Sequence, residues 1–396
     1  MITVEEAKSI LINNIVELKE SVRVPLRDAL GCRLAEDIYA PLDLPPFNQS
    51  NVDGYAVKFS MNKNNQWKVI TEIKAGDNNS TILKEGEAAR IYTGAMVPDG
   101  SDCILMQEKI IRKDNVVECS EAMLTKGEHI RKKGAQIKKG EPALVKGTLI
   151  NPSVIGFIAA LGLAEVVVYR KPKVALIITG NELQTIGTPL ETGKVYESNS
   201  FTIQAALQSI NLHTDKVFFV KDDKKSLEEV VAKALPNADM LLISGGISVG
   251  DYDFVHDVLN ENSTTTLFYK VAQKPGKPLF FGKNKNTFVF GLPGNPASAL
   301  TCFYEYVYPA LRKMQGKESL FLRAVQLPLL KDINKKKGLA HYLKAEVKPN
   351  GIMPLGGQES FIMKSFADAG AFIYLPAEKE NVLAGELVEV NLLPEL

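Results

Sequence analysis

The sequence is poor in the residues that build disulfide scaffolds, zinc sites and nucleic-acid-binding surfaces. Its 396 residues include four Cys, four His and one Trp, and 47 basic against 46 acidic side chains give a formal net charge of +1. The cysteines, at positions 32, 103, 119 and 302, form no C-x-x-C pair, which is typical of buried thiols in a reducing cytoplasm. The near-neutral charge argues against a nucleic-acid partner, because such proteins usually carry a basic excess.

Long apolar runs are also missing. No stretch approaches the ~20 apolar residues that a transmembrane helix needs, so we expect no membrane partner. The opening residues, MITVEEAKSI, are acidic and lack the basic and apolar regions of a secretory signal, which favours a cytoplasmic location. A hydrophobic content of 45% excludes a chain that is mainly disordered.

The first part of the chain combines helical flanks with a β module. The first forty residues favour helices, and a Pro-rich linker follows at residues 41–46. From about residue 52 to 139, short β segments between turns predict a small all-β module. The helices predicted in the flanks cover residues 4–18, 25–34 and 152–163.

The second part of the chain predicts an α/β domain followed by a β domain. Residues 173–318 alternate continuous apolar strands with helices, which indicates a doubly wound, mostly parallel sheet covered on both faces. A long helix over residues 296–314 closes this block. Residues 319–396 are mainly β.

The strongest local signal is the segment S-G-G-I-S-V-G-D-Y-D, residues 244–253, between a predicted strand and a predicted helix. Glycines let the backbone approach an anion, and a helix start adds unpaired N–H donors. The segment matches neither the dinucleotide-binding nor the P-loop pattern. The alternative is a tight turn in which Asp253 only caps the helix.

Three carboxylates follow predicted strand ends. Glu182, Asp222 and Asp253 should lie at the carboxyl edge of the sheet, where converging negative charges favour a cation. Oxygen ligands of this kind suit Mg²⁺. Each residue alone is more often a cap or turn residue, so the hypothesis depends on the three together.

Two further turns are candidates for ligand contact. Lys270, Lys274 and Lys277 surround a Pro-Gly turn, and lysines facing a carboxylate cluster can hold phosphates or an oxyanion. The alternative is an ordinary basic hairpin turn. The segment G-L-P-G-N-P, residues 291–296, presents a second rigid turn at the same edge. Loops at 46–56 and 93–98 crowd polar and aromatic residues, although each is also explained as a turn.

Seven motifs in this order resemble the molybdopterin molybdenumtransferase (MoeA) family, which includes the E domain of gephyrin. The resemblance covers nearly the whole chain and is highly specific because the motifs are in register. The motifs are P-P-F-N-Q-S-N-V-D-G-Y-A at 45–56, T-G-A at 93–95, T-G-N-E-L at 179–183, S-G-G-I-S-V-G at 244–250, K-P-G-K-P at 274–278, L-P-G-N-P at 292–296 and G-G-Q-E-S at 356–360.

The resemblance implies a cytoplasmic homodimer that inserts molybdate into adenylylated molybdopterin with Mg²⁺ and releases AMP. It implies a helical dimerisation domain (1–45 and 141–172), an inserted β domain (46–140), an α/β molybdopterin-binding domain (173–318) and a C-terminal β barrel (319–396). The active cleft would be shared between subunits. Contact with molybdopterin adenylyltransferase would also be expected.

The resemblance further implies a set of site residues. The catalytic acids would be Asp53, Glu182, Asp222 and Asp253, of which the last three would bind the metal; Lys270 and Lys274 would bind molybdate. The complete set of substrate-binding residues would be Thr93, Ser244, Gly245, Gly246, Ser248, Gly250, Lys270, Lys274, Pro275, Gly276, Lys277, Pro293, Gly294, Asn295 and Pro296.

Two positions depart from the family pattern. Gln136 stands where the family usually has an aspartate, and the C-terminal G-R-x-x-F-x-R pattern has Leu339 and Lys344 in place of its arginines. Two alternatives therefore stay open: the related molybdopterin adenylyltransferase, which lacks the extra β domains, and a non-catalytic scaffold that keeps the fold. Metal-dependent AMP release would distinguish an enzyme from a scaffold.

Overall fold

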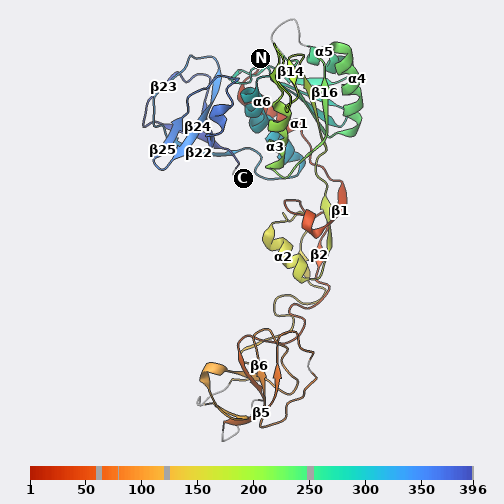
Figure 1. Ribbon diagram of the computed structural model, residues 1–396, viewed down its shortest axis with the longest axis vertical. Helices are drawn as coiled ribbons and strands as arrows, with labels where there is room; N and C mark the ends of the chain where they lie inside the picture. Colours follow the sequence, from red (N-terminus) through yellow and green to blue (C-terminus); the bar gives the residue numbers. More distant parts are fainter. Residues whose placement is uncertain (59–64, 79, 120–124, 248–253, 395–396) are drawn as a thin grey trace. The chain divides into compact units, whose positions relative to one another are not determined.

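The computed structural model describes residues 1–58, 65–78, 80–119, 125–247 and 254–394. These residues form two compact units (Figure 1). Unit 1 comprises Met1–Glu20 and Tyr169–Leu396, and unit 2 comprises Ser21–Val168. All four cysteines are within the described ranges, are buried and form no disulfide. In the same ranges, no helix has the length and apolar character needed to cross a membrane.

Unit 1 is built on a six-stranded sheet of order β16-β13-β17-β21-β20-β18. The first four strands are mutually parallel, and β20 runs antiparallel to both of its neighbours. Every residue of β13, β17 and β21 is buried, which explains their continuous apolar sequences. The mostly parallel α/β sheet is therefore confirmed. Its strands are β13 (Val174–Thr179), β16 (Thr214–Val220), β17 (Met240–Ser244), β18 (Thr265–Tyr269), β20 (Phe280–Asn284) and β21 (Thr287–Leu292).

Helices cover both faces of this sheet (Figure 1). One face carries α1 (Val4–Asn14), α3 (Asn199–Gln208) and α6 (Pro296–Cys302), and the other carries α4 (Lys224–Ala234) and α5 (Phe254–Glu261). Thr3 caps α1 in a capping box with Glu6. The helix predicted over 296–314 continues from α6 through a π-helical turn into α7 (Tyr308–Met314).

The C-terminal part of unit 1 is β, as predicted. Its main sheet has the order β19-β24-β26-β28-β22, with β25 paired to β24, while β23 pairs with β27. A short parallel pair, β14 with β15, follows the first strand of the α/β sheet. The bounds are β14 (Leu183–Gln184), β15 (Val195–Tyr196), β19 (Gln273–Lys274), β22 (Arg323–Pro328), β23 (Ile333–Asn334), β24 (Ala340–Lys348), β25 (Gly351–Pro354), β26 (Ala371–Leu375), β27 (Asn381–Val382) and β28 (Leu387–Leu392).

Unit 2 contains a six-stranded sheet of order β7-β4-β6-β5-β9-β8 with a hydrophobic cluster on each face. Trp67 is buried in one of these clusters. The sheet strands are β4 (Gly54–Val57), β5 (Gln66–Ile73), β6 (Glu87–Ile91), β7 (Cys103–Met106), β8 (Ile110–Lys113) and β9 (Val116–Cys119).

The rest of unit 2 mixes one helix with short strand pairs. The helix predicted from residue 152 is α2 (Pro152–Ala160), whereas the helix predicted over 25–34 is wrong. Ser21–Pro25 is a strand and Leu26–Asp28 is a single 3₁₀ turn. The apolar side chains of this segment pack in one core with α2, and they do so from turns rather than from a helix. The pairs are formed by β1 (Ser21–Pro25) with β12 (Glu165–Tyr169), β2 (Ile38–Tyr39) with β11 (Pro142–Leu144), and β3 (Gln49–Ser50) with β10 (Ile130–Arg131).

Candidate active site

Loops that follow four parallel strands meet at one cavity of unit 1. This main cavity has a volume of about 650 Å³ and is lined by segments that follow β13, β16, β17 and β21. The chain passes from β13 to β16 on one side and then returns to β17 on the other side of β13. Doubly wound sheets bind ligands at such a reversal of strand order, outside the carboxyl ends of the strands.

The structure brings together many of the predicted site residues. Of the other predicted residues of unit 1, Lys270, Lys274, Pro275 and Gly276 do not line the main cavity. Ser248, Gly250 and Asp253 are outside the described residues. The predicted residues that line the cavity are Glu182, Asp222, Ser244, Gly245, Gly246, Lys277, Pro293, Gly294, Asn295 and Pro296.

Two glycines allow the strand ends to approach closely. Gly245 has a φ of +95°, and a Cβ atom there would lie 2.0 Å from the carbonyl oxygen of Thr179. Gly246 has a φ of +65°, and its Cβ would lie 3.3 Å from Oδ1 of Asp222. Side chains at these positions would therefore separate β17 from β13 and crowd the carboxylate.

Asp222 is held in place by groups at the end of β13. Its Oδ1 accepts a hydrogen bond from the Thr179 hydroxyl at 3.0 Å, and its backbone N–H donates to Asn181 Oδ1 at 3.1 Å. Glu182 lines the same cavity. Among the described residues there is no group of three or more His, Cys, Asp or Glu side chains placed to hold a metal. A three-carboxylate site would thus need Asp253, which lies outside those residues.

Asn199 and Glu197, at the start of α3, also line the main cavity, although no motif predicted them as site residues. Asn199 Nδ2 donates to Ser244 Oγ at 2.9 Å and to the carbonyl oxygen of Gly294 at 2.8 Å, so it joins two of the turns that line the cavity. Glu197 is buried and accepts hydrogen bonds from the backbone N–H and the hydroxyl of Ser200. The polar run E-S-N-S before a helix was the signal that could have identified both residues.

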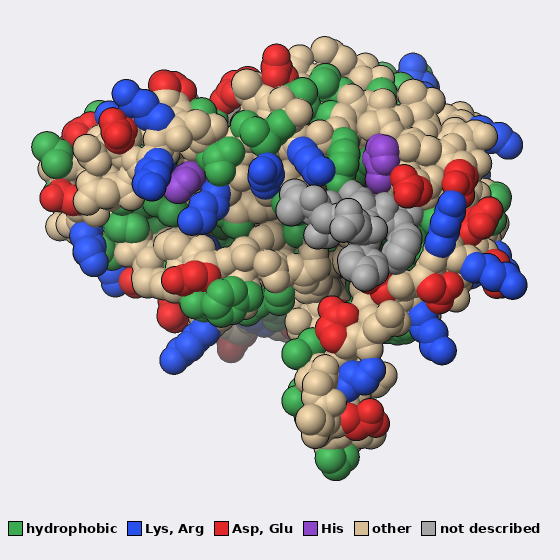
Figure 2. Space-filling view, turned by 90° about the horizontal axis from the view of Figure 1, so that it is seen from above, with side chains coloured by type: hydrophobic (Ala, Val, Ile, Leu, Met, Phe, Trp, Pro, Cys, Tyr) green, Lys and Arg blue, Asp and Glu red, His purple; other side chains and the backbone are tan. Residues whose placement is uncertain are grey.

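The buried side-chain amide of Gln273 holds the K-P-G-K-P turn in place. Gln273 Nε2 donates to the carbonyl oxygens of Pro275, at 3.1 Å, and Gly276, at 3.3 Å. Lys277 lines the main cavity, whereas the Lys270 ammonium lies 4.5 Å from the ring centroid of Tyr269. Figure 2 shows Lys and Arg side chains interspersed with Asp and Glu side chains over the face seen from above.

The C-terminal G-G-Q-E-S motif contacts the L-P-G-N-P turn, residues 292–296. Asn295 Nδ2 donates to Ser360 Oγ at 2.8 Å. Lys344, one of the two departures in the C-terminal pattern, is buried and donates from Nζ to the carbonyl oxygens of Gly357 and Ile362, at 2.7 and 2.8 Å. Burial lowers the pKa of Lys344. This lysine therefore fastens the loop that presents Ser360.

In unit 2, the structure joins two predicted residues directly. Asp53 Oδ1 accepts hydrogen bonds from the backbone N–H and the hydroxyl of Thr93, at 2.8 and 2.9 Å. These hydrogen bonds lower the pKa of the partly exposed Asp53 carboxyl. Gln136 lines a separate hollow with Leu44 and Arg131.

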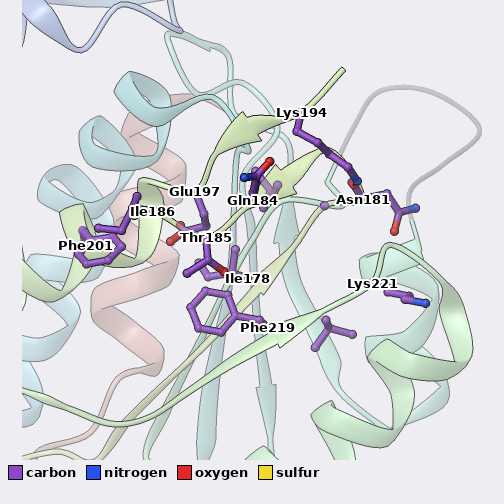
Figure 3. Close-up of a pocket in the computed structure, with 13 residues that line it drawn as sticks. Ile178, Asn181, Gln184, Thr185, Ile186, Lys194, Glu197, Phe201, Phe219 and Lys221 are labelled. Carbon is purple, nitrogen blue, oxygen red and sulfur yellow. The ribbon is translucent and has the colours of Figure 1, made fainter. Parts of the chain in front are cut away.

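A second cavity of unit 1, the side pocket, adjoins the main cavity (Figure 3). It has a volume of about 520 Å³ and shares Ile178, Gly180, Leu183 and Glu197 with the main cavity. No sequence pattern identified it. Its other lining residues are Asn181, Gln184, Thr185, Ile186, Lys194, Phe201, Phe219, Val220 and Lys221.

Three family models match successive parts of the chain. Residues 2–162 match the MoeA N-terminal region (domain I and II), and residues 175–313 match a probable molybdopterin binding domain. Residues 326–393 match the MoeA C-terminal region (domain IV). The matches follow the motif order found in the sequence.

Known proteins resemble the chain over its full length. A molybdopterin molybdenumtransferase from Haemophilus influenzae is 33% identical over 400 residues, which cover 99% of this chain and 98% of that protein. One from Staphylococcus epidermidis is 33% identical over 401 residues, covering 99% and 95%. A crystal structure of a molybdopterin biosynthesis MoeA protein from Pyrococcus horikoshii is 33% identical, with a TM-score of 0.79 and coverage of 99% of both chains.

Proposed function

This chain belongs to the molybdopterin molybdenumtransferase (MoeA) family, transferases of molybdenum-cofactor biosynthesis, and we propose that it inserts molybdate into adenylylated molybdopterin with release of AMP. The observation that carries the proposal is the meeting of carboxylates, a lysine and Gly/Pro-rich turns at the main cavity. Cleavage of a phosphoanhydride-type link requires charge neutralisation and positioning more than a protein nucleophile. The main cavity offers groups for both tasks.

We assign Mg²⁺ to Glu182 and Asp222, with Asp253 as the third predicted ligand. The donor set fits, because two carboxylates line the cavity and the Thr179 hydroxyl lies beside one of them, all hard oxygen groups. When bound, the ion would neutralise charge on the reacting phosphate. Thr179 and Asn181 keep the Asp222 carboxylate oriented before the substrate arrives.

Lysines of the K-P-G-K-P turn supply positive charge for the molybdate dianion. Lys277 lines the cavity, and we keep Lys270 and Lys274 as the predicted molybdate-binding residues. Charge-assisted hydrogen bonds from ammonium groups are stronger than those between neutral groups. Asn199 and Asn295 hold the surrounding turns in place through their hydrogen bonds.

An AMP-release assay with adenylylated molybdopterin, Mg²⁺ and molybdate tests the activity. Asp222→Asn and Glu182→Gln should each lower turnover by about 100-fold or more, because each removes a charge that neutralises the transition state. Glu191→Gln is the matched control, since Glu191 is exposed in the same segment and lies outside the main cavity. Full AMP release in EDTA would contradict the Mg²⁺ assignment.

The proposal includes a cytoplasmic homodimer in which Asp53 and Thr93 of one subunit complete the main cavity of the other. The two hydrogen bonds from Thr93 keep the Asp53 carboxylate ionised and fixed. The four-domain boundaries, the helical dimerisation part and the C-terminal barrel belong to the same proposal. Contact with molybdopterin adenylyltransferase, as the source of the adenylylated substrate, does so as well.

Subunit complementation tests the shared site. An Asp53→Ala chain mixed with an Asp222→Ala chain should recover about one intact site per heterodimer, because each chain supplies what the other lacks. Each variant alone should remain inactive. Sedimentation of the wild-type chain as a monomer, or absence of recovery after verified subunit exchange, would contradict the shared cleft.

A further inference from the structure

Residues 1–3 form a short strap beside the segment that carries Lys270. Ile2 makes a parallel β-bridge with Val271. Its backbone N–H donates to the carbonyl oxygen of Lys270 at 3.1 Å, and its carbonyl oxygen accepts from the Ala272 N–H at 2.8 Å. The strap is therefore bonded on both sides of Val271 to a segment that begins with a predicted molybdate-binding lysine.

A capping box anchors the strap to the core of unit 1. The Thr3 hydroxyl oxygen accepts from the Glu6 N–H at 3.1 Å, and Glu6 Oε2 accepts from the Thr3 N–H at 2.8 Å. These reciprocal hydrogen bonds satisfy N–H groups at the helix start and hold Thr3 against α1. The helix is fixed in turn, because Ala7 and Leu11 are buried in the main core of unit 1. The strap is thus attached to a rigid element.

Lys270 has a backbone conformation that needs such support. Its φ is +67°, in the left-handed region that residues with a side chain rarely adopt. Residues in this region persist only where the surrounding structure holds them, and they cluster at active sites and ligand clamps. The Lys270 N–H donates to the carbonyl oxygen of Leu279 at 2.9 Å, while its own carbonyl oxygen accepts from Ile2. Both sides of the lysine backbone are therefore fixed, one of them by the strap.

The same segment leads directly to the main cavity. The Val271 N–H donates at 3.0 Å to the carbonyl oxygen of Lys277, which lines that cavity. The Lys270 ammonium lies 4.5 Å from the ring centroid of Tyr269, and the His256 ring stacks on Tyr269 at 5.0 Å. An aromatic ring attracts a cation in this position. Lys270 is thus held through its backbone and its side chain, while it stays partly exposed to an incoming anion.

We propose that the strap positions Lys270 for oxyanion binding, an inference that rests on the proposed function. A lysine whose backbone is already fixed loses less conformational freedom when it binds the molybdate dianion, so its charge-assisted hydrogen bonds contribute more to affinity. Ile2 acts through its backbone N–H group, which makes it a positioning residue. A strap that only stabilised the fold would affect stability without a selective loss of molybdate affinity.

Proline at position 2 removes the N–H donor and keeps the carbonyl acceptor. Titration calorimetry of the full chain with molybdate alone should show binding about 3- to 10-fold weaker in Ile2→Pro, the range expected for loss of one hydrogen bond. In the AMP-release assay, the KM for molybdate should rise by the same factor while kcat stays unchanged. Ile2→Ala is the matched control, because it shortens the side chain, keeps the N–H and should bind molybdate like the wild type. All chains carry the same N-terminal affinity tag, so that residue 2 stays within the polypeptide.

A double-mutant cycle tests whether the strap acts through Lys270. Lys270→Gln removes the positive charge and should weaken molybdate binding. Addition of Ile2→Pro to Lys270→Gln should cause little further loss, because the charge that the strap positions has gone. Glu6→Ala guards against misfolding of the proline variant. It loosens the capping box without a proline and should weaken molybdate binding by about 2- to 3-fold, with an unchanged circular dichroism spectrum.

The outcomes separate this inference from the proposed function. Wild-type molybdate affinity in both Ile2→Pro and Glu6→Ala, or equal losses in Ile2→Pro and Ile2→Ala, overturns the positioning role even if the chain releases AMP. Losses that simply add in the double-mutant cycle also overturn it, as does the absence of molybdate binding by the wild-type chain. Unchanged binding in Lys270→Gln overturns it and removes Lys270 from the molybdate site. Failure of the wild-type chain to release AMP from the adenylylated substrate rejects the proposed reaction and leaves the calorimetric result in place.

Discussion

Replacement of Gln273 should loosen the K-P-G-K-P turn and destabilise unit 1. The Gln273 side chain is completely buried; its Nε2 donates to the carbonyl oxygens of Pro275 and Gly276, and its Oε1 accepts from the Tyr306 hydroxyl. Gln273→Leu has a similar volume and removes all three hydrogen bonds. The turn would then lose the support that fixes Lys277 at the main cavity.

The expected loss follows from the three hydrogen bonds. Each contributes a net ~1 kcal/mol, so the free energy of unfolding of unit 1 should fall by about 3 kcal/mol. The Gly276 carbonyl keeps only the Cys302 thiol, 3.7 Å away, and the buried Tyr306 hydroxyl loses its Gln273 acceptor, which makes this a lower bound. The KM for molybdate should rise by about tenfold or more, because small displacements of positioned groups are costly for catalysis.

Urea unfolding followed by far-UV circular dichroism measures the stability change. The fluorescence of Trp67, buried in the separate core of unit 2, should report a transition at its wild-type midpoint. Tyr306→Phe should cost about 1 kcal/mol, and less than that when added to Gln273→Leu, since the hydroxyl has already lost its partner. A wild-type urea midpoint and a wild-type molybdate KM in Gln273→Leu would refute this reasoning.

Two further predictions concern backbone fit and charge. Gly245→Ala should abolish AMP release and lower the melting temperature more than Gly187→Ala, which has a similar φ of +92° but nothing within 4 Å of its Cβ position; equal losses would show that φ alone matters. Thr93→Val removes one donor to Asp53, so the lowered pKa of that carboxyl should rise towards its ordinary value. Asp53 would then lose its negative charge at a higher pH during acidification, which a ¹³C carboxyl titration measures; an unchanged pKa would exclude the hydroxyl as a cause.

Sequence patterns predicted the elements that are buried on both sides. Val174–Thr179 and Met240–Ser244 are continuous apolar strands because helices cover both faces of their sheet. The loops after such strands must meet at one edge, so the order of strands and loops along the chain was enough to place Glu182 and Asp222 at a common cavity. The all-β character of residues 52–139 was also evident from short segments and turns.

Features that depend on distant contacts could not be predicted. Asn199 bonds to groups that lie 45 and 95 residues away along the chain, and a single sequence does not show such pairs. The side pocket forms between α3 and the edge strand β16, so it has no local motif. The helix predicted over 25–34 failed because spacing alone does not distinguish a helix from turns packed against another helix.

The chain leaves unit 1 after Glu20 and returns at Tyr169, so unit 2 is inserted behind the first helix. Arg170 closes the insertion point, since its guanidinium contacts the carboxylates of Glu20 and Asp239. During synthesis, α1 leaves the ribosome about 150 residues before its sheet, a delay of ~10–30 s at ordinary elongation rates. Its apolar side chains cannot pack against that sheet while unit 2 is being synthesised. The apolar face of α1 therefore stays exposed to solvent until the sheet of unit 1 has been synthesised.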